Sequence, residues 1–120
     1  FKDYPAIGVG IGQWRTKYEE SYRLPSENQH LYHAHNNFIQ LLSEVGILGL
    51  LGVLIFYGYM VIDNAKIWYR RRDPYSLCAM IAVFSYVFVF GQIEYTLDNS
   101  SGIRLMYFIL GTMLQLRENS

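Results

Sequence analysis

The sequence has little that could fix its fold covalently, and it has no excess of charge of either sign. Cys78 is the single cysteine among 120 residues, so no internal disulfide can form. A metal site built on cysteine is set aside for the same reason. Ten basic and ten acidic residues give a formal net charge of zero. Charge is therefore informative only through its distribution along the chain.

An initiator methionine and a signal-like segment are also lacking at the start of the chain, where Phe1 stands. We therefore expect an excerpt from a longer protein. Polar residues of mixed charge fill positions 1–37, whereas positions 38–116 are mostly apolar and are broken by two short polar intervals. This division predicts an external segment, residues 1–37, followed by a membrane-spanning part, residues 38–120.

Three apolar stretches are candidates for membrane-spanning helices, because a bilayer core of roughly 30 Å needs about 20 apolar residues per helix. They cover about residues 38–62, 77–93 and 103–116. The third is the weakest candidate, because it is short and contains Arg104. Buried helices of a soluble protein are the alternative, but such helices usually show a polar face, and residues 45–62 carry no charge. The predicted fold is all-α, a polytopic membrane helical bundle with about three spans.

Basic residues gather in one of the two polar intervals. The interval 63–76 contains Lys66, Arg70, Arg71 and Arg72. The interval 94–102 has two acidic residues and no lysine or arginine. The positive-inside rule therefore predicts that 63–76 is a cytoplasmic loop, that 1–37 lies outside and that the C-terminus is cytoplasmic. Because the arginine triplet sits directly between two spans, nucleic acid is not an expected partner.

All three histidines lie just before the first apolar stretch, at His30, His33 and His35. Residues two positions apart, such as His33 and His35, project the same way from an extended chain, which suggests zinc. No cysteine and no well-spaced pair of carboxylates nearby completes a tetrahedral set, so we expect no metal. Polar residues at a membrane interface are a plainer interpretation of the group.

A helix that starts near Asn36 would carry a polar stripe at its outer end, because residues three and four apart share a face. The stripe would comprise Asn36, Gln40, Ser43 and Glu44, opposite a face of Gly46, Gly49 and Gly52 that lets another helix approach. A carboxylate near the centre of a spanning helix costs about 2.5–3.5 kcal/mol, and less toward the interface. Glu44 is therefore expected to face protein or water. Together these residues predict a polar cavity at the outer membrane face.

Two sequence patterns in this part of the chain, taken together, are similar to patterns known from other proteins. One is His35-Asn36, nine residues and then Gly46-Ile-Leu-Gly49; the other is the run Pro5-Ala-Ile-Gly8-Val-Gly10-Ile-Gly12-Gln-Trp14. Both resemble patterns of the O-antigen ligase and polymerase superfamily, although Leu50 stands where that signature usually has Gly, Thr or Tyr. The resemblance implies that the chain is the end of the family's large periplasmic loop plus its last three spans. It also implies that many upstream transmembrane helices are missing.

The resemblance implies a reaction, the transfer of a glycan from undecaprenyl diphosphate to an acceptor hydroxyl without nucleotide sugar, metal or other cofactor. A base must take the hydroxyl proton, and the unperturbed pKa of histidine, about 6.5, suits that task. Matching the motif assigns this role to His35. Asn36 or Glu44 would orient its ring, and His33 is an alternative or supporting residue.

Positive charge must also stabilise the departing diphosphate, for which the donor fork of arginine is well shaped. The family's diphosphate-binding arginines are expected mostly upstream of this chain, which alone is expected to be inactive. Arg15, Arg23 and Arg104 lie on the predicted outer side. They are candidates for diphosphate contacts, with solvated loop charges (Arg15, Arg23) and a membrane anchor (Arg104) as the alternatives.

The acceptor separates three activities within the family. Ligases use the lipid A core, polymerases use another lipid-linked repeat, and protein O-oligosaccharyltransferases use serine or threonine. A ligase in the bacterial inner membrane is the first expectation, with membrane lipids, the lipid-linked glycan and a hydroxyl acceptor as partners. A transporter or a structural membrane subunit is the alternative from another class. Transporters carry polar features near mid-membrane, whereas the polar residues here gather at the outer end.

Overall fold

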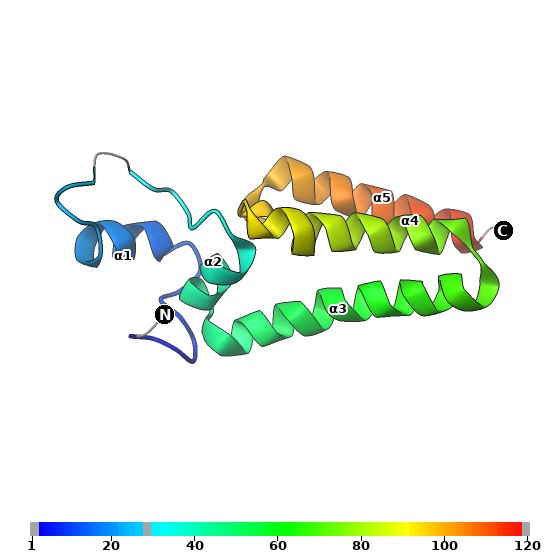
Figure 1. Cartoon of the computed structure of the whole chain (residues 1–120), viewed down its shortest axis with the longest axis horizontal. Helices are drawn as coiled ribbons and strands as arrows, with labels where there is room; N and C mark the ends of the chain where they lie inside the picture. The colour runs from blue at the N-terminus through cyan, green and yellow to red at the C-terminus, as the bar shows by residue number, and fades with distance from the viewer. Residues whose placement is uncertain (1–2, 28–29, 119–120) are drawn as a thin grey trace.

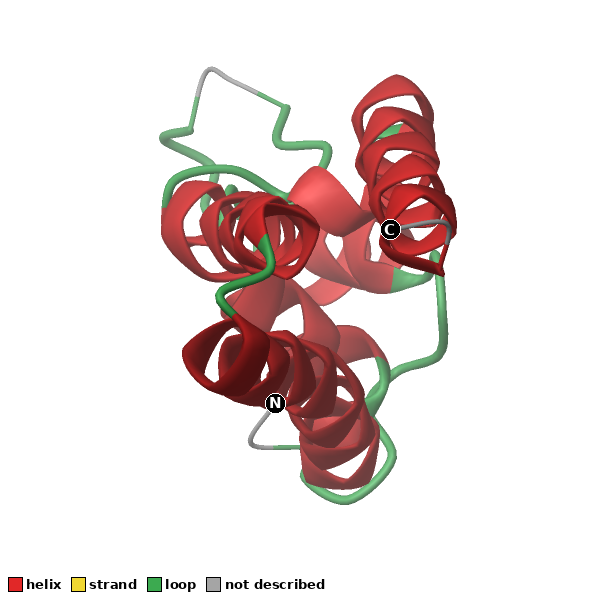
Figure 2. Cartoon of the chain, turned by 90° about the vertical axis from the view of Figure 1, so that its right-hand side faces the viewer, coloured by secondary structure: helices red, strands yellow, loops and turns green. Residues whose placement is uncertain are grey.

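The computed structural model describes residues 3–27 and 30–118. Its five α-helices are α1 (Trp14–Ser21), α2 (Asn37–Glu44), α3 (Gly46–Arg71), α4 (Pro74–Val83) and α5 (Ser100–Glu118). Between α4 and α5 lie the π-helical segment η1 (Phe84–Val89) and the 3-10 turns η2 (Phe90–Gln92) and η3 (Thr96–Asp98). The described residues contain helices and loops and no strand (Figure 2), so the predicted all-α fold is confirmed.

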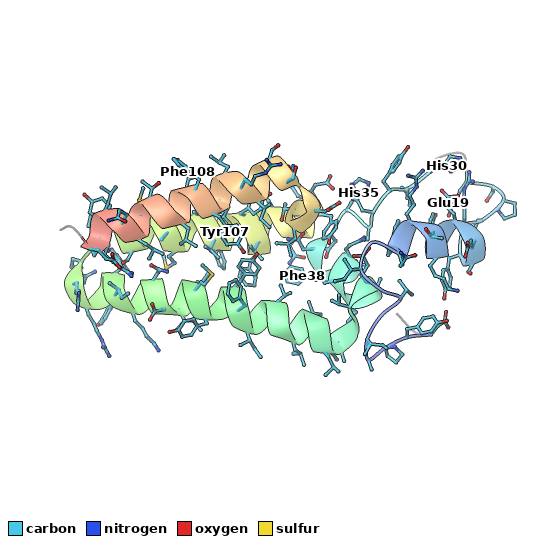
Figure 3. All side chains as sticks on the ribbon, turned by 180° about the vertical axis from the view of Figure 1, so that it is seen from behind. Glu19, His30, His35, Phe38, Tyr107 and Phe108 are labelled. Atoms are coloured by element: carbon cyan, nitrogen blue, oxygen red, sulfur yellow. The ribbon has the colours of Figure 1, made fainter. Side chains whose placement is uncertain are left out.

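The three long helical runs form an antiparallel bundle, in which α4 packs against both α3 and α5 (Figure 1). The external segment and α2 lie at one end of this bundle, and the C-terminus lies at the other. The buried core is small and consists of Tyr57, Ala79, Val83, Val87, Met106 and Leu110. The hydroxyls of Tyr57 and Tyr107 are 2.8 Å apart and join α3 to α5. Figure 3 shows Tyr107 directed toward α3 and Phe108 directed away from the bundle.

Among the residues that the structure describes, two helical runs are long and apolar enough to cross a membrane: α3 and the continuous run Pro74–Gln92. Only 11% of the most apolar stretch of α3 is buried. Its exposed large apolar side chains include Ile47, Leu48, Leu51, Ile55, Phe56, Tyr59 and Ile62. Contiguous apolar surface of this extent is not left in water by a soluble protein. The fold is therefore a membrane helical bundle, and which residues of it lie in the bilayer stays a prediction.

The interval predicted as a basic loop, 63–76, is helical except at its centre. Arg72 ends α3 in the left-handed conformation, with φ of 55°. Asp73 then caps α4, because its carboxylate accepts hydrogen bonds from the backbone N–H groups of Tyr75 at 3.4 Å and Ser76 at 2.7 Å. Pro74 follows at the first helical position, where its missing N–H costs nothing. Helix propensity and capping thus reduce the loop to a tight turn.

The predicted single helix from Asn36 is instead two helices that meet at Val45. Gly46 adopts φ of 66°, a left-handed conformation that only glycine takes without strain. A Cβ on Gly46 would lie 2.3 Å from the carbonyl oxygen of Ala6, and a Cβ on Gly49 would lie 2.3 Å from the side chain of Val45. The expectation that these two glycines face a neighbouring helix is therefore wrong, because the external segment and the break itself occupy that space.

The backbone of the external segment stabilises this break by pairing with both helix ends. Val9 N–H and Gly10 N–H donate to the carbonyls of Ser43 and Glu44, both at 2.8 Å. On the other side, Ile47 N–H and Leu48 N–H donate to the carbonyls of Pro5 at 3.0 Å and Ala6 at 3.3 Å. These groups are the ones that a helix end leaves without an internal partner. We call this end of the bundle, residues 5–10, 33–48 and 91–98, the junction.

Candidate active site

His35 lies two residues before the start of α2, at the end of the bundle where the external segment joins it (Figure 3). Its backbone has φ of 48°. Positive φ is uncommon outside glycine, and such residues cluster at functional sites. The next residue, Asn36, is the N-cap of α2, and its Oδ1 accepts from the N–H groups of Phe38 at 2.9 Å and Ile39 at 3.1 Å. The cap fixes where the helix starts and so fixes the position of His35.

Glu94, which sequence reasoning did not select, joins His35 to His33. The Nδ1 atom of His35 lies 3.2 and 3.1 Å from the two carboxylate oxygens of Glu94. The Nδ1 atom of His33 lies 3.3 Å from Oε1 of the same carboxylate. The two imidazole rings meet edge to face, with centroids 4.4 Å apart. We call these three residues the His–Glu cluster.

The electrostatics of the cluster favour an ionised carboxylate. The hydrogen bond with His35 holds the pKa of Glu94 below its usual range, and the bond from the backbone N–H of Tyr95 at 2.9 Å acts in the same direction. Burial has the opposite effect, but it is weak because about half of the Glu94 side chain is exposed. The cluster therefore consists of two histidine side chains around one anionic carboxylate, open to solvent.

The loop that carries Glu94 is fixed to α2 by a buried asparagine that sequence reasoning also missed. Asn37 is fully buried; its Nδ2 donates to Val87 O at 3.1 Å and to Thr96 Oγ1 at 2.8 Å. Its Oδ1 accepts from the backbone N–H groups of Thr96 at 2.8 Å and Leu97 at 3.3 Å. A Cβ on Gly91 would lie 2.2 Å from Asn37 Nδ2, so glycine is needed for this approach.

The π-helical turn η1 supplies acceptors for the same connection. Its carbonyls at Tyr86 and Val87 accept side-chain hydrogen bonds from Thr96, at 3.1 Å, and from Asn37. Single π-helical turns are rare and occur frequently at functional sites. Asn36 adds a bond from its Nδ2 to Gln92 O at 3.0 Å. Hydrogen bonds thus join the start of α2 to the loop that follows the helical run Pro74–Gln92, on both sides of the His–Glu cluster.

Glu44 is buried, as expected for a carboxylate that must avoid lipid, with 5% of its surface exposed. It accepts a hydrogen bond from Gln40 Nε2 at 2.9 Å, and Gln40 Oε1 in turn accepts from the backbone N–H of Ala34 at 2.8 Å. Glu44 therefore supports the backbone next to His35, whereas the ring of His35 contacts Glu94. An orienting role for Glu44 or Asn36 stays a prediction.

The three candidate arginines have contacts outside the His–Glu cluster. Arg23 pairs with Glu19 at 3.2 Å and donates to Glu27 O at 2.9 Å. The guanidinium of Arg15 lies over the ring of Tyr32, 4.2 Å from its centroid. Arg104 Nε donates to Ser100 O at 2.7 Å within its own helix. Diphosphate binding by these residues stays a prediction.

The His–Glu cluster is also the one group within the described residues that could hold a metal ion, since one ligand atom from each residue lies within 4.8 Å of the others. No metal is expected from the sequence because no cysteine and no well-spaced pair of carboxylates nearby completes a tetrahedral set, and this stays a prediction. The structure adds one carboxylate, Glu94, from 59 residues further along the chain. Hydrogen bonds between imidazole N–H groups and an anion account for the same distances.

Fold and site together define a membrane helical protein with a polar, histidine-bearing end. Residues 1–54 match the family model described as O-antigen ligase. The exopolysaccharide production protein ExoQ of Rhizobium meliloti (strain 1021) is 28% identical over an alignment that covers 91% of this chain and 27% of the relative. No solved structure matches the chain.

Both likenesses support the O-antigen ligase and polymerase superfamily, which the sequence patterns also predict. Members of this superfamily are glycosyltransferase-like membrane enzymes. The chain spans about a quarter of the length of the curated relative that it matches. The match to the family model includes His35, the break at Gly46 and the external segment that packs against it.

Proposed function

We propose that the chain carries part of the active site of a glycosyltransferase that moves a glycan from undecaprenyl diphosphate to an acceptor hydroxyl, with His35 as the general base. The observation that carries the proposal is the pairing of His35 with a carboxylate at the open end of an apolar bundle. A base bonded to an anion at the surface of a membrane protein suits a substrate whose lipid lies in the bilayer and whose sugar lies outside it.

In the proposed reaction, His35 takes the proton from the acceptor hydroxyl as its oxygen attacks the anomeric carbon of the glycan. The bond from that carbon to the diphosphate breaks, and undecaprenyl diphosphate leaves with the electron pair. Arginines upstream of this chain, together with Arg15, Arg23 or Arg104, stabilise the negative charge of the leaving group. The step requires no metal and no nucleotide sugar.

The proposed location is the bacterial inner membrane, with the junction on the periplasmic side. Support comes from the opposite end of the bundle, where the last turn of α3 carries Arg70 and Arg71, and Arg72 follows. Basic residues mark the cytoplasmic side of spanning helices. Residues 1–37 and 94–102 then face the periplasm, where lipid-linked glycans would meet the His–Glu cluster.

The proposal includes two candidate activities, which differ in the acceptor that they use. A ligase that uses the lipid A core is the first candidate, favoured by the match to the O-antigen ligase model. A polymerase that uses a second lipid-linked repeat is the second candidate, favoured by a relative named for exopolysaccharide production. Purified protein given only one lipid-linked repeat unit distinguishes them, because a polymerase makes longer lipid-linked chains, whereas a ligase makes no product until lipid A core is added.

The test of the base is His35→Ala in the protein as its own cells make it, scored by long-chain glycan and by protein level. We expect transfer to be abolished at an unchanged protein level. His30→Ala is the matched control, because the two histidine side chains are 56% and 55% exposed and each pairs with one glutamate. Retained transfer in His35→Ala would move the chemistry to His33, or favour a transporter or a structural subunit.

A further inference from the structure

We propose that Glu94 is the positioning residue of the base: its carboxylate holds the proton of His35 on Nδ1 and so leaves Nε2 to accept the proton of the hydroxyl. This inference rests on the proposed function of His35. Nothing in the sequence patterns or in the comparisons assigns a role to Glu94.

The first step is the choice of tautomer. A neutral imidazole carries its single proton on one of two nitrogens, and the hydrogen bond of one nitrogen determines which. An ionised carboxylate can only accept, and both oxygens of Glu94 lie within hydrogen-bond distance of His35 Nδ1, at 3.2 and 3.1 Å. His35 Nδ1 must therefore carry the proton. The lone pair is then on Nε2, at the far side of the ring from Glu94.

The second step is that the Glu94 carboxylate contributes little to holding its loop in place. Glu94 is half exposed, and apart from its contacts with the two histidines it accepts a hydrogen bond from the backbone N–H of its own neighbour, Tyr95. The loop is held by other groups: Asn37 binds the backbone at Thr96, and the hydroxyl of Tyr86 donates to Thr96 O at 2.9 Å. Removal of the charge is therefore expected to leave the loop in place.

The third step is the set of groups that fixes the carboxylate against His35. His33 approaches Oε1 from its own segment, with Nδ1 at 3.3 Å, and the ring of Tyr95 lies behind His33 with centroids 6.1 Å apart. The backbone N–H of His35 is 3.4 Å from the same His33 Nδ1, so this nitrogen donates to Glu94 only in the tautomer in which it does not accept from His35. Among the described residues, the titratable groups in contact with the His35 ring are His33 and Glu94. The contact of both Glu94 oxygens with His35, at 3.2 and 3.1 Å, is therefore the one that fixes the carboxylate against the base.

The test compares Glu94→Gln and Glu94→Asp with the wild-type protein in lipid vesicles, using the lipid-linked glycan and acceptor isolated from its own host. Asp98→Asn is the matched control, because Asp98 is an exposed acid on the same loop. We expect Glu94→Gln to lower kcat roughly 10- to 100-fold with little change in KM, since general-base catalysis as a whole contributes about 10²- to 10⁴-fold. Glu94→Asp retains part of the rate, and Asp98→Asn retains all of it.

The split between kcat and KM, together with rescue by the shorter carboxylate, separates positioning from a structural role. A carboxylate that orients the base acts on kcat and leaves substrate binding unchanged. Glu94→Gln with unchanged kcat overturns the inference, and so does a loss in which KM rises to the same extent and Glu94→Asp restores nothing. Activity that EDTA removes and zinc restores would also overturn it, because Glu94 would then be a ligand.

The two proposals fail in different ways. If His35→Ala is inactive and Glu94→Gln is fully active, the assignment of His35 as the base is supported and the assignment of Glu94 as its positioning residue is refuted. If His35→Ala remains active, the proposed function itself fails, whatever the result at Glu94.

Discussion

The junction and the bundle of α3, α4 and α5 are held together by different means. In the junction, polar residues are buried: Asn37, Gln40, Glu44 and Thr96 are at most 7% exposed, and each has hydrogen-bond partners. In the bundle, two polar side chains, Asn64 and Ser76, are also buried, but a small apolar core is surrounded mainly by large apolar side chains that are exposed. The junction therefore contains the groups that fix its own geometry, whereas the bundle leaves its apolar surface to lipid or to other helices.

The difference has a functional meaning. A proton transfer needs donor and acceptor held within a fraction of an ångström, which a network of satisfied hydrogen bonds provides. A spanning bundle needs only apolar surface and internal backbone bonds. Substitutions of similar size should therefore lower the free energy of unfolding more in the junction than in the bundle.

Gly46→Ala should have the largest effect on stability. It combines a left-handed backbone with a Cβ placed 2.3 Å from Ala6 O, and we expect a loss of about 2–5 kcal/mol. Gly52→Ala in α3 is the control, because no heavy atom lies within 4 Å of its Cβ, and it should stabilise by roughly 0.5–1 kcal/mol. Thermal unfolding in detergent measures both. Equal melting temperatures for the two variants would contradict the claim that the junction is more sensitive to substitution than the bundle.

Asn37→Ser should be the next most costly change. It removes side-chain bonds to Val87, Thr96 and Leu97 and leaves buried N–H groups unpaired, a loss of roughly 2–4 kcal/mol. The adjacent Asn36→Ser keeps a good N-cap for α2 and should cost about 0.5 kcal/mol or less. The same unfolding experiment compares them. Similar losses at both positions would mean that Asn37 does not fasten the loop of Glu94 to α2.

Within the bundle, Tyr107→Phe should cost about 1 kcal/mol, because it removes the bond to the Tyr57 hydroxyl. Its neighbour Phe108 is 71% exposed and points away from the bundle (Figure 3). Phe108→Leu should therefore change the stability of the chain in detergent by less than about 0.5 kcal/mol. A larger loss for Phe108→Leu than for Tyr107→Phe would show that the outward face of α5 is covered by protein.

The smallest effect is a pH dependence of the junction. Because the pKa of Glu94 is lowered in the folded protein, its contribution to stability is present above the ordinary carboxyl pKa of about 4.3 and is lost as pH falls through the folded value. Melting temperatures of the wild type and of Glu94→Gln should therefore converge below about pH 4. The pKa of Glu19 is lowered by His30 in both proteins, so it cancels in the difference. A gap that stays constant with pH would contradict the His–Glu pairing.

Much of the fold follows from local sequence. Apolar runs of about 20 residues predict the helices because the thickness of a bilayer sets that length. The His35 motif predicts the location of the site for a similar reason, since its residues are close in sequence. The break at Val45 could not be predicted this way. It depends on the carbonyls of Pro5 and Ala6, which reach α3 from about 40 residues upstream.

Glu94 was missed for the same physical reason. Its contact with His35 forms only when the helical run Pro74–Gln92 returns to the junction, which places Glu94 beside a histidine 59 residues earlier in the chain. A usable signal was present: Glu94 is the first charged residue after residues 77–93, on the side predicted to hold His35. Glu44, which is closer in sequence, was chosen instead, and it contacts Gln40.

The measurement that tests the central claim most directly is glycan transfer by the purified protein in lipid vesicles, with His35→Ala compared to His30→Ala. Loss of a general base lowers the rate by about 10²- to 10⁴-fold. We predict a loss of that size for His35→Ala and a rate within about twofold of wild type for His30→Ala, at equal melting temperatures. A rate for His35→Ala that matches that of His30→Ala would contradict the assignment of the base to the junction.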